Sequence, residues 1–171
     1  MSIEPLFTAG QIAGAVQRMA VELEAHYGSE RPVKVLALLN GALWFAADLL
    51  RLLPPNFVLE TVRVSSYGAG RETSGRLHWK SPVPACEGQR VLVLDDVLDS
   101  GITLTAVKAE LLRLGAVEVR TAVLVDKPSG RRVECRADYA GLTAPGEFLV
   151  GYGMDADECY RNLPFIGVLR G

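Results

Sequence analysis

The fold is decided by one stretch, Val91-Leu-Val-Leu-Asp-Asp-Val-Leu-Asp-Ser-Gly-Ile-Thr-Leu-Thr105. It opens with four branched apolar residues, and a run that is apolar on both faces is typical of a central parallel strand covered from each side. After Thr103, apolar residues recur at intervals of three and four until Gly115, which predicts a helix that ends there. The stretch therefore predicts a strand, an acidic turn beginning at Asp95, a loop of small residues and a helix.

The polar residues between this strand and helix suit a phosphorylated ligand. Ligands of open α/β sheets bind at the carboxyl ends of the strands. Ser100, Gly101 and Thr103 offer N–H groups and hydroxyls there, at the start of a helix. The acids of the turn are Asp95, Asp96 and Asp99. They would repel a phosphate unless Mg²⁺ lies between them, or unless they bind sugar hydroxyls instead. The alternative, a polar loop with a Ser or Thr N-cap, needs neither three acids nor a glycine.

Length and composition indicate a single globular domain, residues 1–171, with 49% hydrophobic and 22% charged residues. A net charge of −2 does not favour nucleic acid as a partner. The three scattered cysteines, Cys86, Cys135 and Cys159, predict reduced thiols and a cytoplasmic location. The apolar stretch 35–53 is interrupted by Asp48 and Arg51, so we expect no membrane span.

The remaining pattern predicts an α/β fold, a mostly parallel twisted sheet with helices on both faces. A capping box, Thr8 to Gln11, starts a helix that Gly28 ends. A second helix is expected from Leu43 to Leu53. Further strands are expected at 33–39, 57–64, 76–80, 117–125 and 148–152. The polar connection 129–136 is expected to turn Arg131 and Arg132 to solvent.

The segment Leu94 to Thr103 resembles the phosphoribosyl-pyrophosphate signature of the type I phosphoribosyltransferases. That signature has two adjacent acids, two apolar residues and Asp-(Thr/Ser)-Gly-x-Thr, and every position matches. The resemblance implies that Asp95 and Asp96 hold ribose hydroxyls or Mg²⁺ waters, and that Asp99 lies beside purine N7 as general acid or base. It further implies a loop that grips the 5′-phosphate, formed by Ser100, Gly101, Ile102 and Thr103.

A second segment, Glu147 to Pro164, resembles the hypoxanthine-guanine branch of this family. The resemblance implies a small hood over the sheet, built from about 145–171 with or without the N-terminus. Within it, Phe148 would stack on the purine and the Leu149 backbone would read the base edge. Asp155 would hold a second Mg²⁺ and Arg161 would meet pyrophosphate. Lys127, at the end of a strand, would donate to the 6-oxo group. The plainer alternative is a strand with a buried aromatic residue and a surface Asp and Arg.

Two further loops gain a role from the resemblance. Asn40-Gly41 would form the loop that cradles pyrophosphate, with Leu39–Asn40 as a candidate cis peptide bond. Many relatives have Lys where Asn40 stands, so a direct side-chain charge on pyrophosphate is not predicted. Ser66-Tyr67 resembles the family's lid over the reaction centre. The alternatives are an ordinary tight turn and a solvated hairpin loop.

The implied activity is transfer of 5-phosphoribose from phosphoribosyl pyrophosphate to N9 of hypoxanthine or guanine, with Mg²⁺, in a homodimer or homotetramer. Lys127 argues against adenine, whose 6-amino group is a donor. Two alternatives stay open: a xanthine-preferring enzyme, and a non-catalytic regulator that senses phosphoribosyl pyrophosphate. Dinucleotide binding is not favoured, because no G-x-G-x-x-G follows the first strand.

Overall fold

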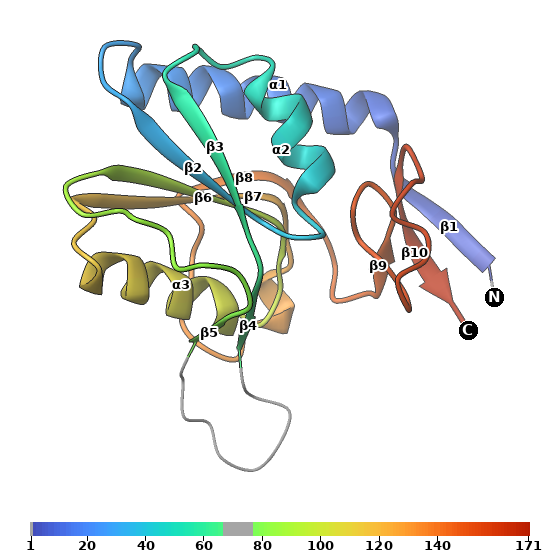
Figure 1. Ribbon diagram of the computed structural model, residues 1–171. Coiled ribbons are helices and arrows are strands. Elements are labelled where there is room, and N and C mark those ends of the chain that lie inside the picture. The colour runs from blue at the N-terminus through green and yellow to red at the C-terminus, as the bar shows by residue number, and fades with distance from the viewer. Residues whose placement is uncertain (1, 67–76) are drawn as a thin grey trace.

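The computed structural model describes residues 2–66 and 77–171. At its centre lies a five-stranded sheet in the order β3-β2-β6-β7-β8 (Figure 1). Its strands are β2 (Val33–Leu38), β3 (Phe57–Val62), β6 (Arg90–Leu98), β7 (Glu118–Asp126) and β8 (Tyr139–Thr143). All neighbouring pairs in this sheet run parallel, which confirms the predicted α/β architecture.

Helices cover both faces of the sheet. Helices α1 (Ala9–Tyr27) and α2 (Leu43–Leu50) lie on one face, and α3 (Ile102–Arg113) lies on the other (Figure 1). Leu92 and Leu94 of β6 belong to the core with α1 and α2, whereas Val91 and Val93 belong to the core with α3. All four are 0% exposed. The unbroken apolar run at 91–94 thus reflects a strand that is buried on both sides.

The ends of the helices follow local chemistry. The predicted capping box of α1 is present: the Gln11 N–H donates to Thr8 Oγ1 at 3.3 Å, and the Gln11 side chain accepts from the Thr8 N–H at 2.9 Å. Gly28 ends α1 with a φ of 65°. Helix α2 stops at Leu50, three residues before the predicted end. No helix in the described part of the chain is long and apolar enough to cross a membrane.

Two small antiparallel sheets complete the described structure. One joins β1 (Ser2–Phe7), β10 (Ile166–Arg170) and β9 (Leu149–Val150), so it brings both ends of the chain together (Figure 1). The other pairs β4 (Val64–Ser66) with β5 (Leu77–Trp79). The sequence patterns did not predict β1, β8 or β10. Strand β8 carries Gly141 at the point where a Cβ would lie 3.0 Å from the sulfur of Met19 in α1. Because α1 packs so closely against β8, this position has no room for an apolar side chain, and the strand lacks the apolar pattern that would predict it.

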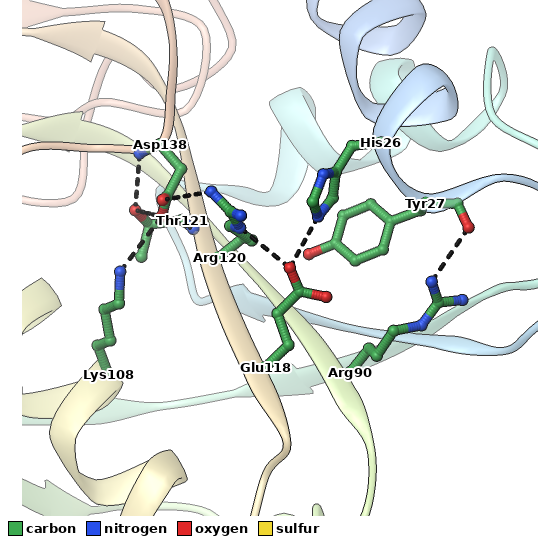
Figure 2. A network of polar contacts seen from close by, with 8 residues as sticks. All are labelled: His26, Tyr27, Arg90, Lys108, Glu118, Arg120, Thr121 and Asp138. Carbon is green, nitrogen blue, oxygen red and sulfur yellow. Dashed lines mark hydrogen bonds and ion pairs between the residues drawn. The ribbon is translucent and has the colours of Figure 1, made fainter.

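At the amino end of the sheet, opposite to the predicted site, a polar network joins the two helical layers (Figure 2). It starts with His26 at the end of α1, whose Nε2 lies 2.7 Å from Glu118 Oε1. The contacts continue through Arg120 to Asp138 and from there to Lys108 of α3, over distances of 3.0, 3.2 and 3.4 Å. Asp138 is the centre of this network, because its carboxylate also accepts from the N–H and the hydroxyl of Thr121.

We expect Asp138→Ala to lower the free energy of unfolding by about 2–3 kcal/mol at pH 7, because the N–H of Thr121, a residue only 1% exposed, loses its acceptor. Burial opposes ionisation of Asp138, but hydrogen bonds from Thr121 and the Lys108 cation outweigh it, so the pKa of Asp138 lies below its usual range. A lowered carboxyl pKa stabilises the fold above the unfolded value of about 3.9. The deficit of the variant should therefore shrink as the pH falls through the lowered pKa.

Urea unfolding of both proteins between pH 7 and pH 3 measures this deficit. Glu30→Ala, at an exposed carboxylate, is the matched control and should stay within about 0.5 kcal/mol of the parent. A deficit that is constant over this pH range would contradict the assigned role of the ionised carboxylate.

Candidate active site

Strand β6 is longer than predicted and includes the first two acids of the central motif, Asp95 and Asp96. The strand does not turn at Asp95 but continues to Leu98, and its register pairs Asp95 with Val123 and Leu98 with Asp126 of β7. The predicted turn at Asp95 is therefore wrong, because the long β7 provides hydrogen-bond partners to the end of the motif. Asp99 follows directly after the strand, at the carboxyl edge of the sheet.

The loop that was predicted to bind phosphate contains Gly101 in the left-handed backbone conformation. Gly101 is the N-cap of α3 with a φ of 80°, and the helix begins at Ile102. A Cβ at Gly101 would lie 2.7 Å from the Cβ of Cys135, so the position requires glycine for space as well as conformation. A Ser or Thr N-cap, the plainer interpretation of this loop, is wrong, although the Ile102 N–H donates to Ser100 Oγ at 3.4 Å.

A cavity of about 380 Å³ lies above the carboxyl ends of β2 and β6. It brings together most of the residues predicted to bind sugar and phosphates. They are Asn40, Gly41, Asp95, Asp96, Asp99, Ser100, Gly101, Thr103, Asp155 and Arg161. Ile102, the remaining residue of the predicted loop, is not among the lining residues. Val64 and Leu104, which were not predicted as site residues, also line the cavity.

Two adjacent carboxylates form the acidic part of this cavity. The Asp96 N–H donates to Asp95 Oδ1 at 3.1 Å, and the Val97 N–H donates to Asp96 Oδ1 at 2.8 Å. Burial raises the pKa of both carboxyl groups, and for Asp95 the nearby Asp96 charge raises it further. Bound hydroxyl donors or a cation would relieve this cost.

The described residues contain no group of three or more His, Cys, Asp or Glu side chains that could hold a metal by themselves. Mg²⁺ is commonly held by one or two carboxylates, while water and substrate oxygens fill the other positions. The half-buried pair Asp95 and Asp96 is a donor set of that kind, and Asp155 adds a third carboxylate to the same cavity. These residues fit a magnesium ion that arrives with a phosphorylated substrate.

The turn after β2 packs tightly between β6 and the hood loop. The Leu39–Asn40 peptide bond is cis, as predicted, and Arg63 Nη2 donates to Asn40 Oδ1 at 2.9 Å. A Cβ on Gly41 would lie 2.0 Å from Asp96 Oδ2, and a Cβ on Gly153 would lie 2.1 Å from the Gly41 carbonyl oxygen. Gly153, Gly41 and Asp96 therefore form a stack in which no extra methyl group fits.

We expect Gly41→Ala to lower kcat/KM roughly tenfold, because the new methyl group must displace the Asp96 carboxylate from its position in the cavity. The KM for the phosphorylated substrate should rise with it. Gly14→Ala is the matched control, since its Cβ would meet nothing within 4 Å, and it should leave activity unchanged. Steady-state kinetics of both variants test the close contact, and an unaltered Gly41→Ala enzyme would contradict it.

A second hollow, of about 170 Å³, adjoins the first on the side of the hood. It shares Asp96, Val97, Asp99 and Asp155 with the larger cavity. Its own residues are Lys127, Phe148, Leu149 and Met154. The three residues predicted to bind the base thus meet at one place, and Met154 joins them without having been predicted.

Lys127 and Asp99 form an ion pair in this second hollow. Lys127 is 8% exposed, and its Nζ lies 2.7 Å from Asp99 Oδ2.

Phe148 is 56% exposed and lies just outside β9, whereas Leu149 is buried. The predicted strand 148–152 is reduced to two residues, because Gly151 and Gly153 take φ values near 100° and turn the chain.

Arg161 connects the hood to the larger cavity. Its Nη1 donates to the Gly153 carbonyl at 2.7 Å, and its Nη2 lies 2.8 Å from Asp155 Oδ1. Its buried Nε has no hydrogen-bond partner among the described residues.

The predicted lid falls largely outside the described residues: Ser66 ends β4, and Tyr67 lies beyond them.

One prediction about the connection after β7 is wrong. Arg132 is exposed as expected, but the Arg131 side chain is only 17% exposed. It turns inward and donates to the backbone carbonyls of Leu98 and Asp99, both at 2.7 Å. Residue type alone could not separate the two arginines, because the buried acceptors come from other parts of the chain.

Fold and site together define a class of protein: a parallel α/β protein whose acids, small-residue loop and basic groups gather at the carboxyl ends of the strands. Residues 2–157 match the phosphoribosyl transferase domain model. The hypoxanthine-guanine phosphoribosyltransferase of Streptococcus pneumoniae R6 is 37% identical over 166 residues, which cover 96% of this chain and 92% of that protein.

Solved structures agree with this match. The hypoxanthine phosphoribosyltransferase of Staphylococcus aureus superimposes with a TM-score of 0.91 at 32% identity, covering 98% of this chain and 91% of that one. A hypoxanthine-guanine phosphoribosyltransferase of Bacillus anthracis gives a TM-score of 0.91 at 34% identity, covering 99% and 100%. The chain therefore belongs to the phosphoribosyltransferase family.

Proposed function

We propose that this protein transfers 5-phosphoribose from phosphoribosyl pyrophosphate to N9 of hypoxanthine or guanine, and so serves purine salvage. The observation that carries the proposal is the pair of adjoining hollows, which share Asp99. One hollow has the groups that a phosphorylated sugar needs, and the other has a buried Lys beside an exposed aromatic ring. A reaction that joins a sugar to a planar base requires both in contact.

On the sugar side, the loop Ser100 to Thr103 would bind the 5′-phosphate through N–H groups and hydroxyls at the start of α3. Asp95 and Asp96 would accept hydrogen bonds from the ribose hydroxyls or from Mg²⁺ waters. Asn40, Gly41 and Arg161 line the side where pyrophosphate would leave. The buried, unpartnered Nε of Arg161 supports this role, since it is a donor without an acceptor among the described residues.

Mg²⁺ is the proposed cofactor, held by Asp95 and Asp96 on one side and by Asp155 for a second ion. When bound, it would supply positive charge against the departing pyrophosphate. The chain's own contribution is to orient the two substrates and to keep the acids and Arg161 fixed around C1 of the sugar.

On the base side, Lys127 would donate to the 6-oxo group, Phe148 would stack on the purine, and the Leu149 backbone would read its edge. Asp99 would lie beside N7 and take up the proton that the base loses as N9 bonds to C1 and the C1–O bond to pyrophosphate breaks. The 2.7 Å contact between Lys127 and Asp99 supports this assignment, because the O6 oxygen needs a donor and a neighbouring N7–H group needs an acceptor that can take its proton.

A cytoplasmic location and a homodimer or homotetramer complete the proposal. The three cysteines are free, as thiols are in a reducing compartment. Exposed apolar side chains on α2 and on the edge strand β3, such as Leu43 and Val58, support association between copies.

The test is an ultraviolet and pyrophosphate-release assay with Mg²⁺, phosphoribosyl pyrophosphate and each of five bases: hypoxanthine, guanine, xanthine, adenine and uracil. Turnover with hypoxanthine and guanine alone is the expected result. Preference for xanthine or another base would overturn the base assignment and keep the sugar site. Tight binding of phosphoribosyl pyrophosphate without turnover of any base would make the protein a non-catalytic sensor.

A further inference from the structure

The Arg131 side chain makes more hydrogen bonds than is usual for an arginine in a surface connection. It caps the 3₁₀ turn Pro128–Gly130, which follows Lys127 directly. Besides the carbonyls of Leu98 and Asp99, its Nη1 approaches the Lys127 carbonyl oxygen at 3.1 Å. Its Nε donates to the Cys135 carbonyl at 2.9 Å, and its Nη2 pairs with the Asp126 carboxylate. All three nitrogens of the guanidinium group are therefore in use.

These contacts join the ends of β6 and β7. Leu98 ends β6 and is followed by Asp99, and Asp126 ends β7 and is followed by Lys127. The same Nη1 contacts the backbone of both Asp99 and Lys127, and the side chains of these two residues meet each other at 2.7 Å. The contacts close a ring from Arg131 through Asp99 and Lys127 back to Arg131.

The ring leaves little room for Asp99 to move. A Cβ on Gly130, the neighbour of Arg131, would lie 1.6 Å from Asp99 Oδ1, so the carboxylate rests directly against this turn. On the other side, the Arg132 N–H donates to the Ser100 carbonyl at 2.9 Å. The turn 128–132 therefore contacts β6 and the loop after it on both sides of Asp99.

We propose that Arg131 is a positioning residue that sets the spacing between Asp99 and Lys127 for the bound base, an inference that rests on the proposed function. The planar guanidinium reaches four backbone carbonyls and one carboxylate at once, whereas the ammonium of Lys is a single point of charge with three donors. Lysine at this position keeps the charge and loses the simultaneous contacts to both strand ends.

The experiment compares Arg131→Lys with Arg132→Lys, the same change at the exposed neighbour. For Arg131→Lys we expect a kcat lowered about 10- to 50-fold and a raised KM for hypoxanthine, the scale of a misplaced reacting group. The KM for phosphoribosyl pyrophosphate and the melting temperature should stay close to those of the parent. Arg132→Lys should match the parent in all four quantities. Asp126→Asn, which removes the anionic partner of Arg131, should act in the same direction with a smaller effect.

The outcomes separate the two proposals. A parent protein that turns over no base overturns the proposed function and this inference with it. An active parent together with unchanged kinetics of Arg131→Lys overturns the inference alone. A merely structural role is indicated if the melting temperature and kcat fall together while the KM for hypoxanthine stays constant, and this also overturns the inference. If Arg131→Lys does not fold, parent-like kinetics of Asp126→Asn decide against it.

Discussion

Asp99→Asn should lower kcat for hypoxanthine roughly 10²–10⁴-fold, the usual scale for acid–base assistance, while the protein remains folded. The amide has the shape of the carboxylate but cannot take up the proton that leaves the base. Asp99 lies at the boundary of the two hollows, at the end of β6, and its side chain is not part of either apolar core. The change should therefore act on the chemical step and not on folding.

Steady-state kinetics and calorimetric binding of phosphoribosyl pyrophosphate test this result. Affinity for phosphoribosyl pyrophosphate should change little, because the 5′-phosphate loop is untouched. Asp157→Asn, at an exposed hood residue with a φ of 49° that asparagine tolerates, is the matched control and should keep full activity. An Asp99→Asn enzyme with the kcat of the parent would remove Asp99 from the catalytic role.

Lys127→Gln should lower kcat/KM for hypoxanthine roughly 10²-fold, which corresponds to the loss of one charge-assisted hydrogen bond of about 3 kcal/mol. The glutamine side chain offers an acceptor as well as a donor, so its carbonyl oxygen can face the 6-amino group of adenine. The kcat/KM for adenine should therefore change less than the kcat/KM for hypoxanthine. The ratio of kcat/KM for hypoxanthine to that for adenine should fall as a result.

The measurement is this ratio in the parent, in Lys127→Gln and in the exposed control Lys80→Gln, which should be indistinguishable from the parent. Loss of activity on all bases by the same factor would show that Lys127 supports the site without reading the 6-position. A rise in the KM for phosphoribosyl pyrophosphate alone would place its contribution on the sugar side.

The sequence predicted best where local chemistry decides the structure. The apolar run before Asp95 is a strand buried on both faces, the capping box of Thr8 starts α1, and Leu39–Asn40 is cis as the family resemblance implied. Each of these features depends on neighbours within a few residues, or on a motif that occupies one short segment. The predicted binding residues could be gathered into one site because carboxyl ends of parallel strands share one edge.

The sequence failed where partners come from distant segments. The extension of β6 through Asp96 depends on β7, which begins more than twenty residues later. Arg131 and Arg132 are adjacent and identical, yet only one finds the carbonyls of Leu98 and Asp99. A Cβ at Gly141 of strand β8 would lie within 3.0 Å of both the Leu124 carbonyl oxygen in β7 and the Met19 sulfur in α1. Such contacts follow from the assembled fold and leave no periodic signal in the chain.

The division of the site into two hollows has an evolutionary consequence. Lys127, Phe148, Leu149 and Met154 line only the smaller hollow, where we propose that the base binds, whereas most of the residues proposed to bind sugar and phosphates line the larger one. Substitutions in the first group can retune which nucleobase is accepted without redesigning the grip on the activated sugar. Asp96, Val97, Asp99 and Asp155 belong to both hollows. With the proposed assignment of the two hollows, selection for a new base would act on the four residues that line the smaller hollow alone, whereas a change at the four shared positions would affect the binding of both substrates.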